Sequence, residues 1–377
     1  MNFRYSIYIN IAIVFFVIGL IIFGCGTKTD MPTDYGSGQG NLGGAGDTTY
    51  IRLTSWSAEQ GSDYQFDHPQ DIIYGWDESI YVADTGNNRI LRYSKTGYFF
   101  ADEIIDIPSD IGFSNPTAIS QDVLMFLYAV NGTNKIFAYL PFSNYQETFR
   151  DTFVVFEGPP DARYMGIASD GTSQHDLYLT DSGRDELVKM RLFSHDLQEV
   201  YVPVDVEGAY VDSVVKVIWE HGTGVTGMDD PRQITVDSDM RIYFVQTCPD
   251  PNAVFYVQSM FWDTELLEYR SELYLQFGTI ANNNLFLEPN DIAVRGQGSV
   301  KYVYVADTGH DLIRVYKFKN NALEFQKPLL NEDGGALFDQ PMGIAVAPFD
   351  DEKEYVIYIA DTNNNRIERY WLSVPKN

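Results

Sequence analysis

Residues 81–93 of the chain read YVADTGNNRILRY, and closely similar text returns at 304–316 (YVADTGHDLIRVY) and at 358–370 (YIADTNNNRIERY). In each copy an apolar run ends at an aspartate, passes five small or polar residues and resumes as a second apolar run. Glycine and asparagine accept the left-handed backbone that a tight reversal needs. The stretch therefore predicts two antiparallel strands joined by a tight turn.

The charged residues of this stretch are predicted to build the turn. A carboxylate at such a position can accept hydrogen bonds from backbone N–H groups of its own turn. We also expect Arg89 and Arg366 to reach back and pair with the aspartates of their own copies. The residues with this structural role are Asp84, Arg89, Asp181, Asp307, Asp361 and Arg366.

The turn belongs to a longer unit that repeats after residue 47. Each unit opens with an aromatic residue and a proline, followed by a short apolar strand, a second strand, the turn and a third strand; residues 66–72, 286–292 and 338–344 open the clearest copies. The turn positions lie 47 to 65 residues apart, at Asp84, Asn131, Asp181, Gln246, Asp307 and Asp361. This spacing suits one four-stranded blade per unit, and six blades are within the range of β-propellers.

The recurring text VADTGNNRI, with its aromatic–proline opening, resembles the NHL repeat of six-bladed propellers over roughly residues 56–372. The first, fifth and sixth copies match well. The fourth lacks the aspartate, the third lacks the proline, and the second and fourth lack the turn arginine. The expected fold class is all-β, a six-bladed β-propeller of four-stranded blades over residues 49–377. Since the last copy supplies only three strands, we expect residues 49–55 to complete the final blade and leave no open edge there.

The N-terminus has the layout of a secretory signal, with one basic residue, an apolar run and a small residue before the expected cut. Residues 22–25 (IFGC) resemble a bacterial lipobox, although Phe23 departs from the small residue preferred there. We predict a signal peptide at 1–24, a lipid on Cys25 and a glycine-rich tether over 25–48. An uncleaved signal anchor is the alternative. Either reading places the body outside the cytoplasm, and the lipoprotein reading places it in the bacterial cell envelope, facing the periplasm or the cell surface.

Composition narrows the range of partners. The net charge of −27 argues against nucleic acid as a partner, because phosphate binding needs clustered Lys and Arg. The aromatic content of 15% suits pleated, half-buried strands. If Cys25 carries lipid, Cys248 has no intramolecular partner and is expected to be a structural thiol. The four long insertions at 140–160, 192–217, 247–275 and 319–337 are expected to hold outer strands and loops.

A candidate site follows from the strand directions. Strands alternate in a blade, so the aromatic–proline segment and the turn should lie on the same face of the disc. Residues next to the proline then surround the mouth of the central channel, where side chains from separate blades converge. The candidate ligand-binding residues are His68, Gln70, Asp71, Arg232, Gln233, Asn290 and Asp291. The alternative is that they only hydrogen-bond to channel water.

The resemblance implies a rigid platform for protein or glycan ligands, and we predict non-catalytic binding at the cell envelope. Related propellers include lyases and lactonases, so an enzyme with a metal-assisted site at the channel mouth is the alternative. A structural subunit of an envelope complex is a further alternative. Among the five histidines, His68 and His310 fall in blades that are not neighbours, and no three-histidine zinc set is apparent. No metal ligands and no catalytic residues are assigned, and no cofactor is expected, with Ca²⁺ or Zn²⁺ in the acidic channel as the alternative.

Overall fold

A computed structural model describes residues 49–101, 104–140, 152–171, 176–190, 193–195, 201–203, 216–219, 227–247, 255–271, 277–279, 286–297, 300–319, 322–326, 328–329, 337–349 and 354–373. All of them belong to one compact unit spanning residues 36–377. The predicted signal peptide, Cys25, the tether over 25–48 and Cys248 lie outside the described residues.

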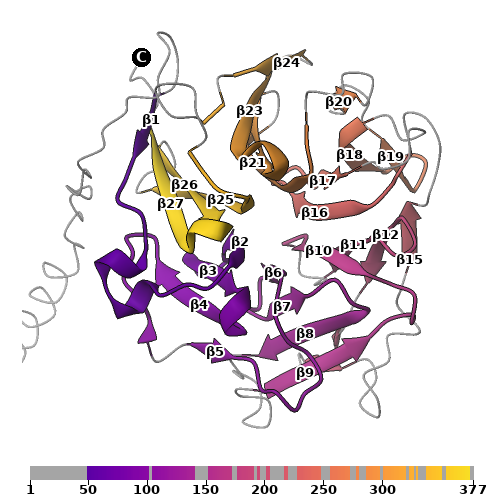
Figure 1. Cartoon of the computed structure of the whole chain (residues 1–377). Helices are drawn as coiled ribbons and strands as arrows, with labels where there is room; N and C mark the ends of the chain where they lie inside the picture. The colour runs from indigo at the N-terminus through magenta and orange to yellow at the C-terminus, as the bar shows by residue number, and fades with distance from the viewer. Residues whose placement is uncertain are drawn as a thin grey trace, which may run out of the picture. The chain divides into compact units, whose positions relative to one another are not determined.

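The strands form six antiparallel blades around a centre, so the predicted propeller is confirmed (Figure 1). Blades 1 to 3 follow in chain order. Blade 1 contains β2 (Pro69–Tyr74), β3 (Ser79–Asp84), β4 (Arg89–Ser94) and β5 (Ile105–Asp106). Blade 2 contains β6 (Ala118–Gln121), β7 (Leu127–Val130), β8 (Lys135–Leu140) and β9 (Thr152–Glu157). Blade 3 contains β10 (Tyr164–Ser169), β11 (Leu177–Asp181), β12 (Glu186–Met190) and β15 (Lys216–Trp219).

The remaining three blades have the same order, with additions. Blade 4 contains β16 (Pro231–Val236), β17 (Ile242–Gln246), β18 (Phe255–Asp263) and β19 (Glu268–Ser271), and β20 (Phe277–Thr279) also pairs with β18. Blade 5 contains β21 (Pro289–Gln297), β22 (Val300–Asp307), β23 (Leu312–Lys319) and β24 (Ala322–Phe325). Blade 6 contains β25 (Pro341–Phe349), β26 (Glu354–Asp361), β27 (Arg366–Ser373) and β1 (Thr49–Arg52).

Short elements accompany the blades. A separate hairpin of β13 (Phe193–His195) and β14 (Tyr201–Pro203) lies within one predicted insertion. All four predicted insertions overlap an outermost strand, namely β9, β15, β19 or β24. Single 3₁₀ turns occur at η1 (Ala58–Gln60), η2 (Ser62–Tyr64), η3 (Thr85–Asn87), η7 (Thr308–His310) and η8 (Thr362–Asn364).

The first strand of the chain closes the ring. β1 pairs antiparallel with β27, as expected from the missing fourth strand of the last copy, and Tyr50 lies opposite Leu372. The innermost strands β2, β6, β10, β16, β21 and β25 contact one another in a closed circle. Pairing with β1 covers the long strand β27 and leaves the four-residue β1 as the outer strand of blade 6, and a short edge strand is a poor template for edge-to-edge aggregation.

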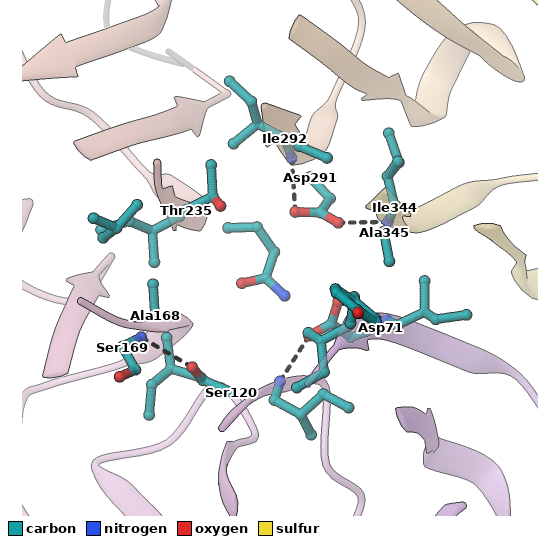
Figure 2. Close-up of a pocket in the computed structure, with 18 of the residues that line it drawn as sticks. Asp71, Ser120, Ala168, Ser169, Thr235, Asp291, Ile292, Ile344 and Ala345 are labelled. Carbon is teal, nitrogen blue, oxygen red and sulfur yellow. Dashed lines mark hydrogen bonds between the residues drawn. The ribbon is translucent and has the colours of Figure 1, made fainter. Parts of the chain in front are cut away.

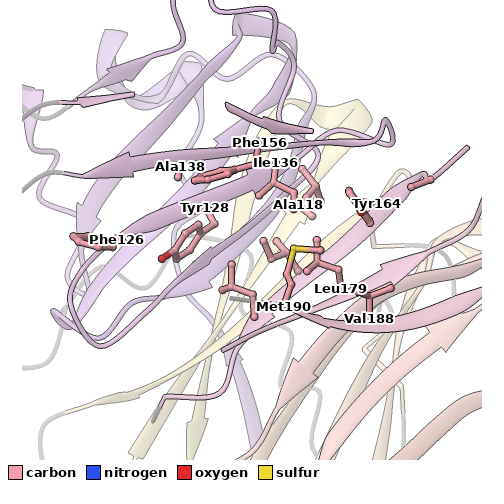
Figure 3. Close-up of a cluster of buried hydrophobic side chains, with 14 residues drawn as sticks. Ala118, Phe126, Tyr128, Ile136, Ala138, Phe156, Tyr164, Leu179, Val188 and Met190 are labelled. Atoms are coloured by element: carbon pink, nitrogen blue, oxygen red, sulfur yellow. The ribbon is translucent and has the colours of Figure 1, made fainter. Parts of the chain in front are cut away.

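The core lies between the blades. Among the described residues, six buried apolar clusters are found, one at each interface between neighbouring blades. At the interface of blades 2 and 3, Tyr128 and Phe156 of one blade face Leu179 and Met190 of the next (Figure 3). Burying one such side chain contributes about 1.5–3 kcal/mol. Apolar packing between sheets is therefore the main force that holds the ring together.

The turn aspartate ties together two parts of its own blade. The buried Asp84 carboxylate accepts the backbone N–H of Asp67 at 2.7 Å and the Arg89 Nε–H at 2.7 Å. In blade 1 the backbone donor thus comes from the aromatic–proline segment. The predicted bond from the turn's own backbone is found in blade 3, where the Gly183 N–H donates to Asp181 at 3.0 Å. Asp181, Asp307 and Asp361 accept the matching N–H groups of Arg163, Leu287 and Asp339.

Arginine pairs with the turn aspartate in four blades of the described chain. Arg366 lies 2.8 Å from Asp361, and Arg184 lies 2.8 Å from Asp181. In blade 5, Leu312 occupies the usual arginine position, and Arg314 reaches Asp307 at 2.5 Å instead. The pair is therefore kept although the sequence position of the arginine changes.

Two other residues of the motif, the threonine and the second asparagine, join one blade to the next. The Thr85 hydroxyl donates to the Pro116 carbonyl of blade 2 at 2.6 Å, and the Asn88 side-chain oxygen accepts the Asn115 N–H at 2.7 Å. The same contacts close the ring between blades 6 and 1, where the Thr362 hydroxyl donates to the Pro69 carbonyl and the His68 N–H donates to the Asn365 side-chain oxygen, both at 2.7 Å. The residues of the DTGNN motif therefore form hydrogen bonds both within a blade and to the neighbouring blade.

Removing one of these interblade bonds has a predictable cost. Thr362→Val should lower the free energy of unfolding by about 1–3 kcal/mol, because the buried Pro69 carbonyl loses its donor. Thr96→Val, at an exposed turn, is the matched control and should change stability by less than about 0.5 kcal/mol. Chemical denaturation followed by circular dichroism measures both. Equal stability of the two variants would contradict the role assigned to Thr362.

A second repeated feature was not recognised from the sequence. A buried tyrosine precedes each turn position by three residues, at Tyr81, Tyr128, Tyr178, Tyr243, Tyr304 and Tyr358. In blades 1, 2 and 4 its hydroxyl donates to an aspartate of the loop between the first two strands, respectively Asp77, Asp122 and Asp237, at 2.9–3.0 Å. These bonds fasten the face of the disc opposite the DTGNN turns.

Candidate functional site in the central channel

The innermost strands enclose a cavity of about 270 Å³ along the propeller axis. Its lining comes from β2, β6, β10, β16, β21 and β25, one strand from each blade. Most lining residues are Ile, Val or Ala, and a few polar side chains are set among them. An apolar cavity with a small number of converging polar groups is the usual form of a small-ligand site.

One end of the cavity lies at the residue two positions after the proline of each repeat unit. In blade 3, Tyr164 stands in place of the proline. Around the ring this position holds Asp71, Ala118, Gly166, Gln233, Asp291 and Gly343. Asp71 is 2% exposed, Asp291 is 5% exposed and Gln233 is 5% exposed. We call the three polar residues the channel floor.

Both floor aspartates bridge neighbouring blades. Asp71 accepts the backbone N–H of Ile72 at 2.7 Å and that of Ile119, in blade 2, at 2.7 Å. Asp291 accepts the N–H of Ile292 and that of Ile344, in blade 6, both at 2.6 Å (Figure 2). These bonds fix the two carboxylates on the channel wall and leave each oxygen with a further lone pair.

The two carboxylates influence each other. They flank Gly343, where a Cβ atom would lie 2.7 Å from the Asp71 Cα, so blades 6 and 1 approach closely there. Burial raises the pKa of Asp71 to about 6, against the opposing effect of its N–H donors and of the Gln233 amide. Burial and the charge of Asp71 raise the pKa of Asp291 well above its ordinary value. The floor therefore resists carrying two negative charges without a compensating cation.

Gln233 completes the floor from blade 4, which lies opposite blade 1 in the ring. Its side chain hydrogen-bonds the Asp71 carboxylate and so lowers that group's pKa. Its Oε1 is buried without a hydrogen-bond partner. Gly166 lies against this oxygen, and a Cβ there would come within 2.9 Å of it. The floor thus contains one acceptor that a bound donor could satisfy.

The other end of the cavity lies at the loops between the first two strands of each blade. Ser120 accepts the Ser169 N–H at 2.9 Å, and Thr235 lies on the same inner wall (Figure 2). Trp76 lines this end and is 53% exposed. Its backbone N–H donates to Gln121 of blade 2 at 2.7 Å.

The Trp76 indole extends as far as blade 3. A Cβ atom on Gly171, in the corresponding loop of that blade, would lie 2.2 Å from the indole Cζ2. Gly171 has φ +66°, which also favours glycine. The indole therefore lies over the mouth of the channel beside the backbone of a blade two positions away.

The structure brings together only some of the predicted site residues. Asp71, Gln233 and Asp291 line the cavity, whereas the other four do not. The exposed His68 pairs with Asp67 at 2.6 Å, and Arg232 pairs with Asp230 at 2.6 Å. The Asn290 amide donates to the Met342 carbonyl at 2.9 Å, and Gln70 is half-buried.

The cavity extends in a direction that the sequence did not indicate. We expected the site to open on the face that carries the DTGNN turns. The lining runs instead from the buried floor toward Trp76, on the opposite face. A tryptophan directly after Gly75 in a loop was a visible signal, but its distance from other blades could not be inferred without the ring.

Within the described ranges no three His, Cys, Asp or Glu side chains are grouped so that they could hold a metal ion. No helix formed by the described residues is long and apolar enough to cross a membrane.

Comparisons with known proteins agree with this architecture. The NHL repeat family model matches residues 66–93. The aldose sugar dehydrogenase of Streptomyces coelicolor, in its PQQ-bound form, is 13% identical with a TM-score of 0.51, covering 86% of this chain and 98% of that one. A gluconolactonase from Xanthomonas campestris is 12% identical with a TM-score of 0.50, covering 88% and 90%.

A third solved structure also has a similar fold. The β-propeller domain of Cps50 (Swd1) from Myceliophteria thermophila is 8% identical with a TM-score of 0.51, covering 85% of this chain and 99% of that one. Curated protein sequences give no match. At these identities the structural likeness establishes the fold alone. The chain is thus a six-bladed β-propeller that carries an NHL repeat at residues 66–93.

Proposed function

We propose that the protein is a lipid-anchored, non-catalytic binding module of the bacterial cell envelope. Its ligand, a protein or a glycan, inserts a small group into the central channel. The observation that carries this proposal is the cavity itself, which has a buried polar floor built from three separate blades and an exposed tryptophan at its mouth. Rigid interblade bonding preorganises such a cavity, which lowers the entropic cost of binding.

Site-specific photo-crosslinking in living cells tests the proposal. A photoreactive amino acid placed at position 76 should cross-link one discrete partner. The matched control is position 98, because Tyr98 lies in the same blade, is 68% exposed and is remote from the cavity lining. A partner captured equally at both positions, or at neither, would count against a ligand that enters the channel.

An enzyme with a metal-assisted site is the second candidate, because Asp71 and Asp291 lie in one cavity. Elemental analysis of full-length protein purified in detergent without chelators distinguishes the two. One equivalent of Zn²⁺ or Ca²⁺, lost in the Asp71→Ala/Asp291→Ala variant, would favour the enzyme. Metal-free protein that still captures its partner would favour the binding module. Ala118 and Gly343 occupy the same ring position in other blades, so the substitutions suit the local backbone.

Membrane attachment through Cys25 is tested separately. We expect Cys25→Ser to abolish incorporation of a labelled fatty acid and to release the protein from the membrane fraction. The tether over 25–48 would then give the anchored propeller lateral reach. Unchanged lipidation and processing of the variant would overturn the lipoprotein proposal.

A further inference from the structure

The channel floor combines two buried acids with no basic partner. None of the described residues that line the cavity is Lys, Arg or His. Buried carboxylates in native proteins are normally paired with a cation or hydrogen-bonded on every side. Here backbone N–H groups satisfy part of each carboxylate, but no side chain of the lining neutralises the charge.

Gln233 gives an independent indication of the ligand. Its Oε1 is a buried acceptor without a donor, in the same floor as the two acids. A buried acceptor left without a donor is unfavourable, because it has lost its hydrogen bonds to water without gaining others. A ligand that brings N–H donors together with a positive charge would satisfy the acids and the amide oxygen at once.

The walls above the floor define the rest of the ligand. Their residues are mainly isoleucine, valine and alanine, whose side chains also pack into the clusters between blades. Asp71 and Tyr74 are three residues apart on β2, so the floor lies roughly 10 Å from the far end of the strand at a rise of about 3.3 Å per residue. Trp76 then offers an aromatic face at the mouth. The channel is therefore long enough for an extended, unbranched stem with a charged tip.

We propose that the channel binds a primary alkylammonium group, whose ammonium contacts Asp71, Asp291 and Gln233 and whose apolar stem lies along the channel wall beneath Trp76. This inference rests on the proposed binding function and names the chemistry of the group that enters. The shared chemistry is present in free alkylamines and in lysine side chains. A Ca²⁺ ion fits less well, since it takes 6–8 oxygen ligands and the described floor offers two carboxylates and one amide oxygen.

Calorimetric titration of the full-length protein in detergent provides the test. Hexylammonium should bind at one site, whereas hexanol and hexanoate, which share its stem, should bind at least tenfold more weakly. Asp71→Ala and Asp291→Ala should each weaken hexylammonium binding at least tenfold while the circular dichroism spectrum stays unchanged. Trp76→Ala should weaken it severalfold. Titration with Nα-acetyl-lysine amide and with glucosamine distinguishes a lysine side chain or free alkylamine from an amino sugar.

The pH dependence adds a readout that a purely apolar pocket would not show. Because Asp71 must be ionised to hold an ammonium, binding should weaken as pH falls through its pKa of about 6, and binding near pH 6 should release protons. The number of protons released is determined by repeating the titration in buffers of different ionisation enthalpy. Hexanol that binds as well as hexylammonium, or Ca²⁺ that binds instead, would overturn the inference.

The inference and the proposed function can fail separately. Cross-linking from position 76 could capture a discrete partner although no ammonium probe binds. That result would contradict the alkylammonium proposal and still support the binding module. If hexylammonium binds but no partner is captured at position 76, the channel site is supported and the proposal of a protein or glycan ligand is contradicted.

Discussion

Replacing Asp84 by alanine should lower the free energy of unfolding by about 3–5 kcal/mol, the range for removing one partner of a buried ion pair. The carboxylate is fully buried and bonds both Arg89 and the backbone N–H of Asp67. Without it, the arginine loses its counterion, and the aromatic–proline segment is no longer fastened to the turn. The midpoint of urea denaturation, followed by circular dichroism, measures the change.

Blade 2 provides a matched control for this experiment. Asn131 stands at the position of Asp84 there, is partly exposed and has no arginine partner among the described residues. Asn131→Ala should therefore cost only about 1 kcal/mol, the net contribution of ordinary hydrogen bonds. A similar loss in the two variants would show that the ion pair adds nothing beyond the turn geometry.

The second large effect concerns pH. The folded protein holds a proton on Asp71 up to a pKa of about 6, whereas an unfolded aspartate ionises near its ordinary pKa of about 3.9. The folded state therefore binds more protons between these values, and stability from this group is full at low pH and is lost as pH rises through 6. The loss amounts to about 3 kcal/mol for a shift of about two pKa units. Asp291 acts in the same direction.

Comparison with a variant isolates the contribution of the floor. Other carboxylates and the overall negative charge also respond to pH, so the relevant quantity is the difference between wild type and Asp71→Ala/Asp291→Ala. Measured from pH 4 to pH 8, wild type should lose at least about 3 kcal/mol more than the double variant. Parallel stability curves for the two proteins would contradict the raised pKa values.

The fold could be predicted because its signal is local and repeated. Turn geometry depends on a few adjacent residues, so DTGNNR predicts a turn wherever it occurs, and the spacing of six copies gives the number of blades. The exchange of roles between Leu312 and Arg314 shows the limit of this reasoning. Only the structure shows that an arginine two positions along the strand still reaches Asp307.

The site was harder to predict, because it depends on distances between blades. Asp71, Gln233 and Asp291 were identified since their ring position follows from the repeat. Trp76 was missed because its importance comes from Gly171, which is 95 residues away in the sequence and two blades away in the ring. His68 and Arg232 were included for their residue types, but their side chains pair locally with Asp67 and Asp230.

The threonine and asparagine bonds between blades have a consequence for where the chain can begin. The junction of blades 6 and 1 is made by Thr362 with Pro69 and by Asn365 with His68, the same pairs that join blades 1 and 2 inside the chain. The junction between the last blade and the first is therefore held by the same hydrogen bonds as a junction inside the chain. A circular permutant that opens in an outer loop of another blade should reassemble the same ring, with every junction intact.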